Sequence, residues 1–209
     1  GAFLLAFIAG TINVVGLLSF QHQSVSHLTG TASFLSLKIM QGDWQLAIHF
    51  CGVMLSFFLG ALLSGLIIQN ATLRLGKRYS AALLLESFLL FTALMMLQHN
   101  YSNSDFLASA ACGLQNAMVS TYSGAIIRTT HITGTVTDLG VMIGQYLRGH
   151  TIDTRKLGLY LLLLIGFITG GLVGAFGFLQ IHYAILWLPI ISTQILALIY
   201  GWYWFRQKH

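Results

Sequence analysis

Six apolar stretches, each long enough to cross a lipid bilayer, restrict what this chain can fold into. A crossing helix needs about 20 apolar residues, because the hydrocarbon core is about 30 Å thick. Only 7% of the residues are charged and the mean hydropathy is +0.78, so a soluble fold could not bury this much apolar surface. The sequence predicts an all-α membrane protein whose partner is the lipid bilayer, built as one transmembrane domain over residues 1–209. The stretches are 2–20, 46–69, 79–98, 105–127, 157–179 and 183–205.

Two shorter apolar segments each follow a nearly identical polar motif. HLTGT occupies residues 27–31 and precedes segment 30–40, whereas HITGT occupies 131–135 and precedes segment 134–147. At about 1.5 Å per residue these segments reach about 16–21 Å, little more than half the bilayer. Backbone that ends at membrane depth is tolerated only where protein or water surrounds it. We therefore expect two central half-helices, either re-entrant or parts of broken spans.

The sequence around the two motifs repeats over a longer distance. AGTINVV at 9–15 aligns with CGLQNAM at 112–118, and SHLTGTASFLSL at 26–37 aligns with THITGTVTDLGV at 130–141. QG at 41–42 then aligns with RG at 148–149. Three crossings in each half would give the halves opposite orientations. The sequence predicts a 3+3 inverted-topology repeat, with repeat 1 at 1–98 and repeat 2 at 105–205, and such repeats place a binding site near the midplane.

Lysine and arginine predict the orientation. Cationic residues cluster at 74–78, 148–156 and 206–208, whereas the linkers at 100–105 and 181–182 contain none. Cytoplasmic loops carry the excess of lysine and arginine, so both termini are expected in the cytoplasm. The net charge of +5 is therefore interpreted as a topology signal, and no nucleic-acid partner is expected.

The polar residues around the half-helices predict one central solute site. Helix N-termini have unpaired N–H groups and carry roughly half a positive charge, and two of them would approach the midplane from opposite sides. Thr29 and Thr133 are expected to cap the half-helices, while Gly30 and Gly134 leave room for a ligand. The alternative is that these polar groups only satisfy broken backbone. The predicted set is Asn13, His27, Thr29, Gly30, Gln115, Asn116, Arg128, Thr130, His131, Thr133 and Gly134.

Two intramembrane acids are candidates for proton or ion coupling. Asp138 lies within the second half-helix, and Glu86 lies within span 79–98. An aspartate at a helix centre costs roughly 2.5–3.5 kcal/mol on insertion scales, so it should be paired or close to water. Arg128 is its expected partner, either in a structural salt bridge or in a functional site. The spacing of histidine, cysteine and acidic residues indicates no metal site, no cofactor and no nucleophile motif, so an enzyme is not expected.

Small residues recur every four positions in two of the spans. Patterns of this kind let helix backbones approach closely in lipid. We expect the stripes to pack helices within the protein, although the same residues could also join copies into a homo-oligomer. The stripes are Gly52, Ser56, Gly60 and Ser64 in span 46–69, and Gly166, Gly170 and Gly174 in span 157–179.

Four segments resemble the YoaK-type family of bacterial integral membrane proteins, a domain of unknown function. They are GLQNA at 113–117, RTTHITGTVTDLG at 128–140, SHLTGT at 26–31 and LLLES at 83–87. The resemblance implies a six-span protein of the bacterial inner membrane and brings no substrate with it. Members of that family commonly have aspartate where this chain has Asn13, and often asparagine where it has Thr31.

Two functions fit these patterns. A small secondary transporter or channel-like carrier would hold a small polar or anionic solute between the half-helix N-termini, where the dipoles, Arg128 and the two histidines favour an anion. The alternative is a non-transporting subunit or scaffold that packs against another membrane protein. A water-accessible cavity at the midplane would favour the carrier, whereas a solid core with an exposed small-residue groove would favour the scaffold.

Overall fold

The computed structural model describes all residues except 20–24, 69–76, 100, 102, 123–127 and 209. Within this part the chain forms eight α-helices and one short 3₁₀ helix, without a strand, which confirms the all-α prediction. Three of the predicted spans end at residues 20, 69 and 127, and these ends lie outside the described residues, as does the cationic residue Arg74. The helices are α1 (Ala2–Leu18), α2 (Leu28–Met40), α3 (Trp44–Ile67), α4 (Lys77–Gln98), α5 (Ser104–Tyr122), α6 (Ile132–Leu147), α7 (Thr154–Ile181), η1 (His182–Leu186) and α8 (Trp187–Lys208).

Three stretches of the described chain are long and apolar enough to cross a membrane. They are Trp44–Ile67, Lys77–Gln98 and Thr154–Arg206, with mean hydropathy of 2.2, 2.0 and 2.2. The last of them contains α7, η1 and α8, so the three stretches cover four of the six predicted spans. The α1 helix is apolar but has 17 residues, and serine, aspartate, glutamine and asparagine interrupt the apolar surface of α5.

The half-helices α2 and α6 are short, as predicted, but they begin two residues earlier than expected. In each motif the N–H of the last threonine bonds to the histidine carbonyl, so His27 and His131 occupy the N-cap positions. The prediction that Thr29 and Thr133 cap these helices was therefore wrong. Both threonines lie in the first helical turn, and neither helix has a capping hydrogen bond from its N-cap side chain.

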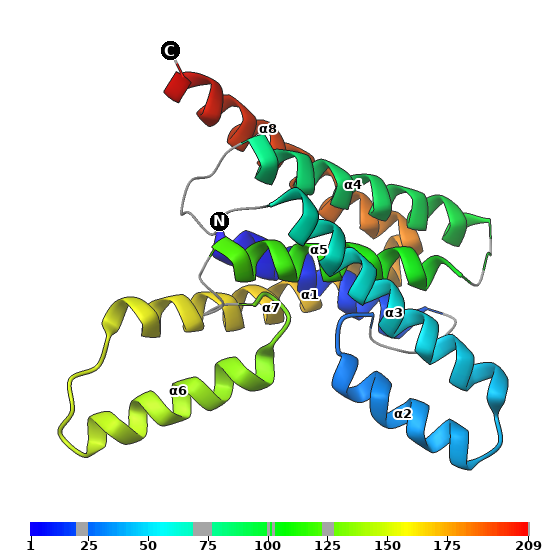
Figure 1. The fold of residues 1–209 in the computed structure, drawn as a ribbon, viewed down its shortest axis with the longest axis horizontal. Helices are drawn as coiled ribbons and strands as arrows, with labels where there is room; N and C mark the ends of the chain where they lie inside the picture. The colour runs from blue at the N-terminus through cyan, green and yellow to red at the C-terminus, as the bar shows by residue number, and fades with distance from the viewer. Residues whose placement is uncertain (20–24, 69–76, 100, 102, 123–127, 209) are drawn as a thin grey trace.

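Each half-helix forms a hairpin with the helix that follows, and each turn contains a glycine and an aspartate. Gly42 and Gly149 follow α2 and α6 with φ values of 73° and 88°, a left-handed conformation that glycine adopts without strain. Asp43 and Asp153 then cap α3 and α7, because the Asp43 carboxylate accepts from the Leu46 N–H and the Asp153 carboxylate accepts from two N–H groups of the first turn of α7. The two hairpins, α2–α3 and α6–α7, diverge from one side of the molecule (Figure 1).

The α1 helix packs along α7 through glycines of both helices. A Cβ atom added at Gly10 would collide with the carbonyl oxygen of Phe167, and one at Gly170 would collide with the carbonyl oxygen of Phe7. The Thr11 hydroxyl also donates to the Gly170 carbonyl at 3.0 Å. Glycine therefore lets these two backbones touch, as small residues do between membrane helices.

The pairing of α5 with α3 has the same arrangement. Gly113 faces the carbonyl oxygen of Phe57, and Gly60 faces that of Ala110, again without room for a Cβ. In each of the four helices, the glycine lies three positions after the residue whose carbonyl faces the glycine of the partner helix. The stripes of α3 and α7 thus pack helices within one chain, as predicted. Because Gly60 and Gly170 are buried, they do not support an oligomer through these stripes.

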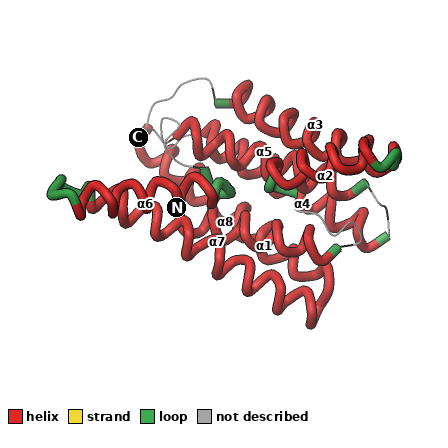
Figure 2. The backbone as a smooth tube through the Cα atoms, turned by 90° about the horizontal axis from the view of Figure 1, so that it is seen from below, coloured by secondary structure: helices red, strands yellow, loops and turns green. Residues whose placement is uncertain are grey.

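The α4 helix lies beside α8 and α5, on the side of the molecule away from the hairpins (Figure 1). The Ser80 hydroxyl donates to the Ala197 carbonyl at 2.7 Å, and the Ser87 hydroxyl donates to the Ile190 carbonyl at 3.2 Å. Apolar side chains from α1, α4, α5 and α8 form the main core. Figure 2 shows that short loops join α2 to α3 and α6 to α7 at the tips of the two hairpins.

Candidate functional site

A cavity of about 760 Å³ opens where the first turns of α2 and α6 approach each other. Its walls come from both half-helix starts, from one face of α5 and from α3. Eight of the eleven predicted site residues border it, whereas Asn13, Gln115 and Gly134 do not. The eight are His27, Thr29, Gly30, Asn116, Arg128, Thr130, His131 and Thr133.

The first-turn residues of both half-helices belong to this cavity wall. Helical hydrogen bonding starts at the N–H groups of Thr31 and Thr135, so the amides of the preceding turn have no partner within their helix. All residues that carry these amides line the cavity, with the exception of Gly134. The positive ends of two helix dipoles consequently face one space.

Asn13 and Asn116 hold the chain just before each half-helix. The Ser26 hydroxyl donates to Asn13 Oδ1 at 2.7 Å. Asn116 Oδ1 accepts from the Thr129 hydroxyl at 2.9 Å and from the Thr130 amide at 3.2 Å, and Asn116 Nδ2 donates to the Thr130 hydroxyl. Asn116 therefore satisfies a backbone N–H before α6, as the structural alternative predicts, and it also borders the cavity, whereas Asn13 bonds a serine side chain.

The two motif histidines have different surroundings. His27 is half-buried and packs edge-to-face on Phe167, with ring centroids 5.7 Å apart. His131 is exposed, and its ring lies against Gly134, where an added Cβ would collide with Nδ1 and Cε1. A Cβ at Gly30 would have no atom within 4 Å. An added methyl group therefore has room at Gly30 of the first motif, whereas the His131 ring occupies that space at Gly134 of the second.

Arg128 and Asp138 do not meet as predicted. Arg128 is exposed and lines the cavity, whereas Asp138 is exposed on α6 and lies near the Tyr160 hydroxyl of α7. Neither residue belongs to an ion pair formed within the described part of the chain. The structure thus leaves Arg128 facing the cavity and places Asp138 within its own hairpin.

Gln115 and Glu86 lie away from the cavity. Gln115 is fully buried and donates from Nε2 to the Leu5 carbonyl at 3.0 Å, which connects α5 to α1. This placement does not fit the prediction that Gln115 binds the solute, because its amide is directed to another helix. Glu86 is fully buried on α4, and among the described residues neither of its carboxylate oxygens has a hydrogen-bond partner.

The sequence analysis missed cavity residues on two helices. Ser120 and Thr121 of α5 follow Asn116 by one helical turn, so a helical projection from Asn116 would have found them. Phe57 and Ala61 come from α3. No sequence signal indicates them, because they reach the cavity only through the packing of α3 on α5.

Comparison with known proteins identifies the family. The family described as "Protein of unknown function (DUF1275)" matches residues 1–199. The chain belongs to this family. It is also 26% identical, over 196 residues, to the "UPF0700 transmembrane protein YoaK" of Bacillus subtilis (strain 168). The matched region covers 90% of this chain and 87% of that protein. No solved structure matches.

This DUF1275 chain is therefore a helical membrane protein, because its apolar helices agree with a transmembrane relative over most of its length. The resemblance to the YoaK-type family that the motifs indicated is confirmed.

In this DUF1275 member, Gly134→Ala is expected to disturb the cavity wall more than Gly30→Ala. The methyl group at position 134 must displace the His131 ring, whereas the one at position 30 enters open space. NMR spectra of histidine-labelled protein can test this, with His131 assigned from a His131→Asn variant. The His131 ring resonances should move in Gly134→Ala, and the His27 resonances should stay in place in Gly30→Ala. Equal shifts in both variants would contradict the described packing.

Proposed function

We propose that this protein is a small secondary transporter or channel-like carrier that holds a small polar or anionic solute between the N-termini of α2 and α6. The observation that carries this proposal is the cavity of about 760 Å³ bordered by both HxTGT motifs. Cavities that bind small molecules typically measure about 300–1,000 Å³, so the space suits a small solute.

The groups around the cavity favour an anion. Arg128 contributes a full positive charge, and the α2 and α6 N-termini contribute partial positive charges and unpaired N–H donors. His27 and His131 add ring nitrogens that can donate to an anion. The described residues that line the cavity include no aspartate or glutamate to oppose these charges.

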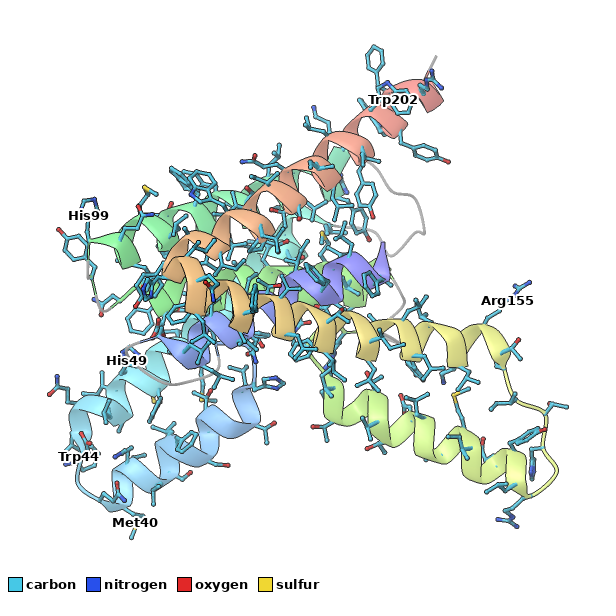
Figure 3. All side chains as sticks on the ribbon, turned by 180° about the vertical axis from the view of Figure 1, so that it is seen from behind. Met40, Trp44, His49, His99, Arg155 and Trp202 are labelled. Carbon is cyan, nitrogen blue, oxygen red and sulfur yellow. The ribbon has the colours of Figure 1, made fainter. Side chains whose placement is uncertain are left out.

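We infer that the chain forms a 3+3 inverted-topology repeat in the bacterial inner membrane, with six crossings and both termini in the cytoplasm. The matching glycine contacts of α1 with α7 and of α5 with α3 support a repeat. Met40, Trp44 and His99 lie toward one end of the molecule, and Arg155 and Trp202 lie toward the other (Figure 3). This separation supports the orientation expected from the positive charges.

A scaffold role has weaker support. The small residues that would receive a partner helix, Gly60 and Gly170, already pack against helices of the same chain.

We likewise propose solute binding rather than catalysis. Among the described residues lining the cavity, the titratable side chains are His27, His131 and Arg128, with no carboxylate or cysteine to complete an acid–base or nucleophile set.

A stabilisation screen on purified protein tests the solute site. Chloride, sulfate, phosphate, acetate and neutral polar solutes are compared at constant ionic strength. A ligand at 100 times its dissociation constant stabilises the folded state by about 2.7 kcal/mol. We expect at least one anion to raise the unfolding temperature and to be transported into vesicles that contain the protein. If no solute stabilises the protein, the cavity is not a solute site and the scaffold becomes the better hypothesis.

The proposed topology predicts which side of the membrane labels a cysteine. Lys77→Cys should react with an impermeant thiol reagent only after the cells are opened, because the 71–78 loop is expected in the cytoplasm. His99→Cys should react in intact cells. Both variants need a Cys51→Ser background, because Cys51 is exposed whereas Cys112 is buried. Labelling of Lys77→Cys from outside would refute the inverted repeat.

A further inference from the structure

Glu86 is the chain's single glutamate and lies on α4, away from the cavity. Its side chain is 0% exposed, and within the described structure neither Oε1 nor Oε2 has a hydrogen-bond partner. A buried carboxyl group of this kind is rare, because buried polar groups in folded proteins are almost always hydrogen-bonded. The cavity between α2 and α6 does not explain this buried carboxyl group, because Glu86 does not border it.

Two of the helices that pack on α4 bring no positive charge to Glu86. The α5 helix places the Cys112 thiol within electrostatic range of the carboxyl group. The α8 helix runs antiparallel to α4, and the bond from Ser87 to Ile190 shows which part of α8 faces Glu86. Residues 187–199 of α8 contain no titratable side chain.

The titratable groups of the other two neighbours, η1 and α3, lie elsewhere. His182 of η1 is exposed, and Tyr183 of η1 lies within electrostatic range of Asp105 at the start of α5. His49 of α3 pairs with the same Asp105, with Nε2 and Oδ2 3.6 Å apart. Lys77 and Arg78 of α4 itself are exposed, and within the described part of the chain Glu86 belongs to no ion pair.

An uncompensated carboxylate is strongly disfavoured in a protein interior without water, and such a group binds a proton and is neutral instead. We propose that Glu86 binds a proton in the folded protein and forms a proton site distinct from the cavity. The neutral carboxyl group has a hydrogen to donate. On the neighbouring helix α5, Gln115 Oε1 is also buried and has no partner in the described structure.

The α5 helix connects this proton site to the cavity. Gly113, Asn116 and Ser120 line the cavity from one face of α5, whereas Cys112 and Gln115 are buried on a different face. A shift of α5 when a solute binds would therefore change the surroundings of Glu86. This coupling rests on the proposed function, whereas the bound proton does not.

Isotope labelling can test the bound proton without a substitution. Because Glu86 is the single glutamate, glutamate labelled with ¹³C at the side-chain carboxyl reports on this site. At neutral pH we expect the infrared C=O band of a protonated carboxylic acid, shifted by the label and absent from Glu86→Gln. A ¹³C NMR signal at the position of a protonated carboxyl group should agree. A labelled signal of an ionised carboxylate alone would overturn the proposal, and this result needs no folded variant.

The same labelled sample tests whether anion binding in the cavity changes the surroundings of Glu86. The infrared band is recorded with and without chloride, sulfate, phosphate or acetate, whichever stabilises the protein. We expect the band to shift or weaken when the anion binds, and an unchanged band would overturn coupling. The Arg128→Gln variant should keep the band while it loses the response to the anion. A protonated Glu86 in a protein that no solute stabilises would support the proton site and overturn the carrier proposal together with the coupling.

Discussion

Gly60→Ala and Gly170→Ala are expected to destabilise the protein strongly, although each adds only one methyl group. The new Cβ would occupy the position of a backbone carbonyl, that of Ala110 for Gly60 and that of Phe7 for Gly170. Neither carbonyl belongs to a flexible side chain, so the paired helices must move apart. Overpacking of this kind costs about 1–3 kcal/mol and occasionally more. We expect a clear fall in the unfolding temperature, measured in detergent, or a loss of folded protein on expression.

Matched controls lie on the same two helices. Gly65 of α3 and Gly158 of α7 would each place an added Cβ in open space, with no atom within 4 Å. Alanine is favoured over glycine inside a helix by about 1 kcal/mol, so Gly65→Ala and Gly158→Ala should be neutral or slightly stabilising. The sign of the effect should therefore reverse along one helix. Equal stability in all four variants would contradict the close approach of α3 to α5 and of α7 to α1.

Gly10→Ala and Gly113→Ala extend this test to the repeat. The two glycines occupy matching positions in α1 and α5 and oppose the carbonyls of Phe167 and Phe57. If the halves of the protein are structural copies, both substitutions should lower stability by similar amounts.

The positions of the helices could largely be predicted from the sequence. Long apolar runs mark α3, α4, α7 and α8, because a bilayer of fixed thickness demands them. The HxTGT motifs mark α2 and α6 to within two residues. The N-cap could not be predicted correctly, because Thr29 and Thr133 are good caps by residue type and the histidines have no capping hydrogen bond. Their carbonyls, which any residue has, accept the first helical bonds.

The pairing of the helices was less predictable. The stripes indicate that α3 and α7 touch other helices, but periodicity does not name the partner. The contacts that determine which helices pair are made by backbone carbonyls, such as that of Phe7 against Gly170. Every residue type has this carbonyl, so the residue type does not indicate the contact. For the same reason Phe57 and Ala61 could not be predicted as cavity residues. The different environments of Asp138, Glu86 and Gln115 also follow from this pairing.

Arg128→Gln is expected to abolish most of the anion stabilisation that the proposed function predicts. Among the described residues that line the cavity, Arg128 is the single lysine or arginine. It is exposed in the structure and joins no ion pair there, so its guanidinium is available to an anion. A hydrogen bond to a charged group contributes about 1.5–3 kcal/mol, and about 1.4 kcal/mol corresponds to a tenfold change in affinity. The substitution should therefore weaken anion binding roughly tenfold to a hundredfold.

The measurement is the dependence of the unfolding temperature on anion concentration at constant ionic strength, because salt itself screens exposed charges. Arg155→Gln is the matched control. It removes the same charge from the exposed first turn of α7 and leaves the cavity wall unchanged. Arg128→Lys should retain part of the affinity, because it keeps the charge but loses the planar set of donors. If Arg128→Gln binds the anion as tightly as Arg155→Gln does, the cationic wall does not select the solute. The helix N-termini would then serve a neutral polar molecule through their N–H groups alone.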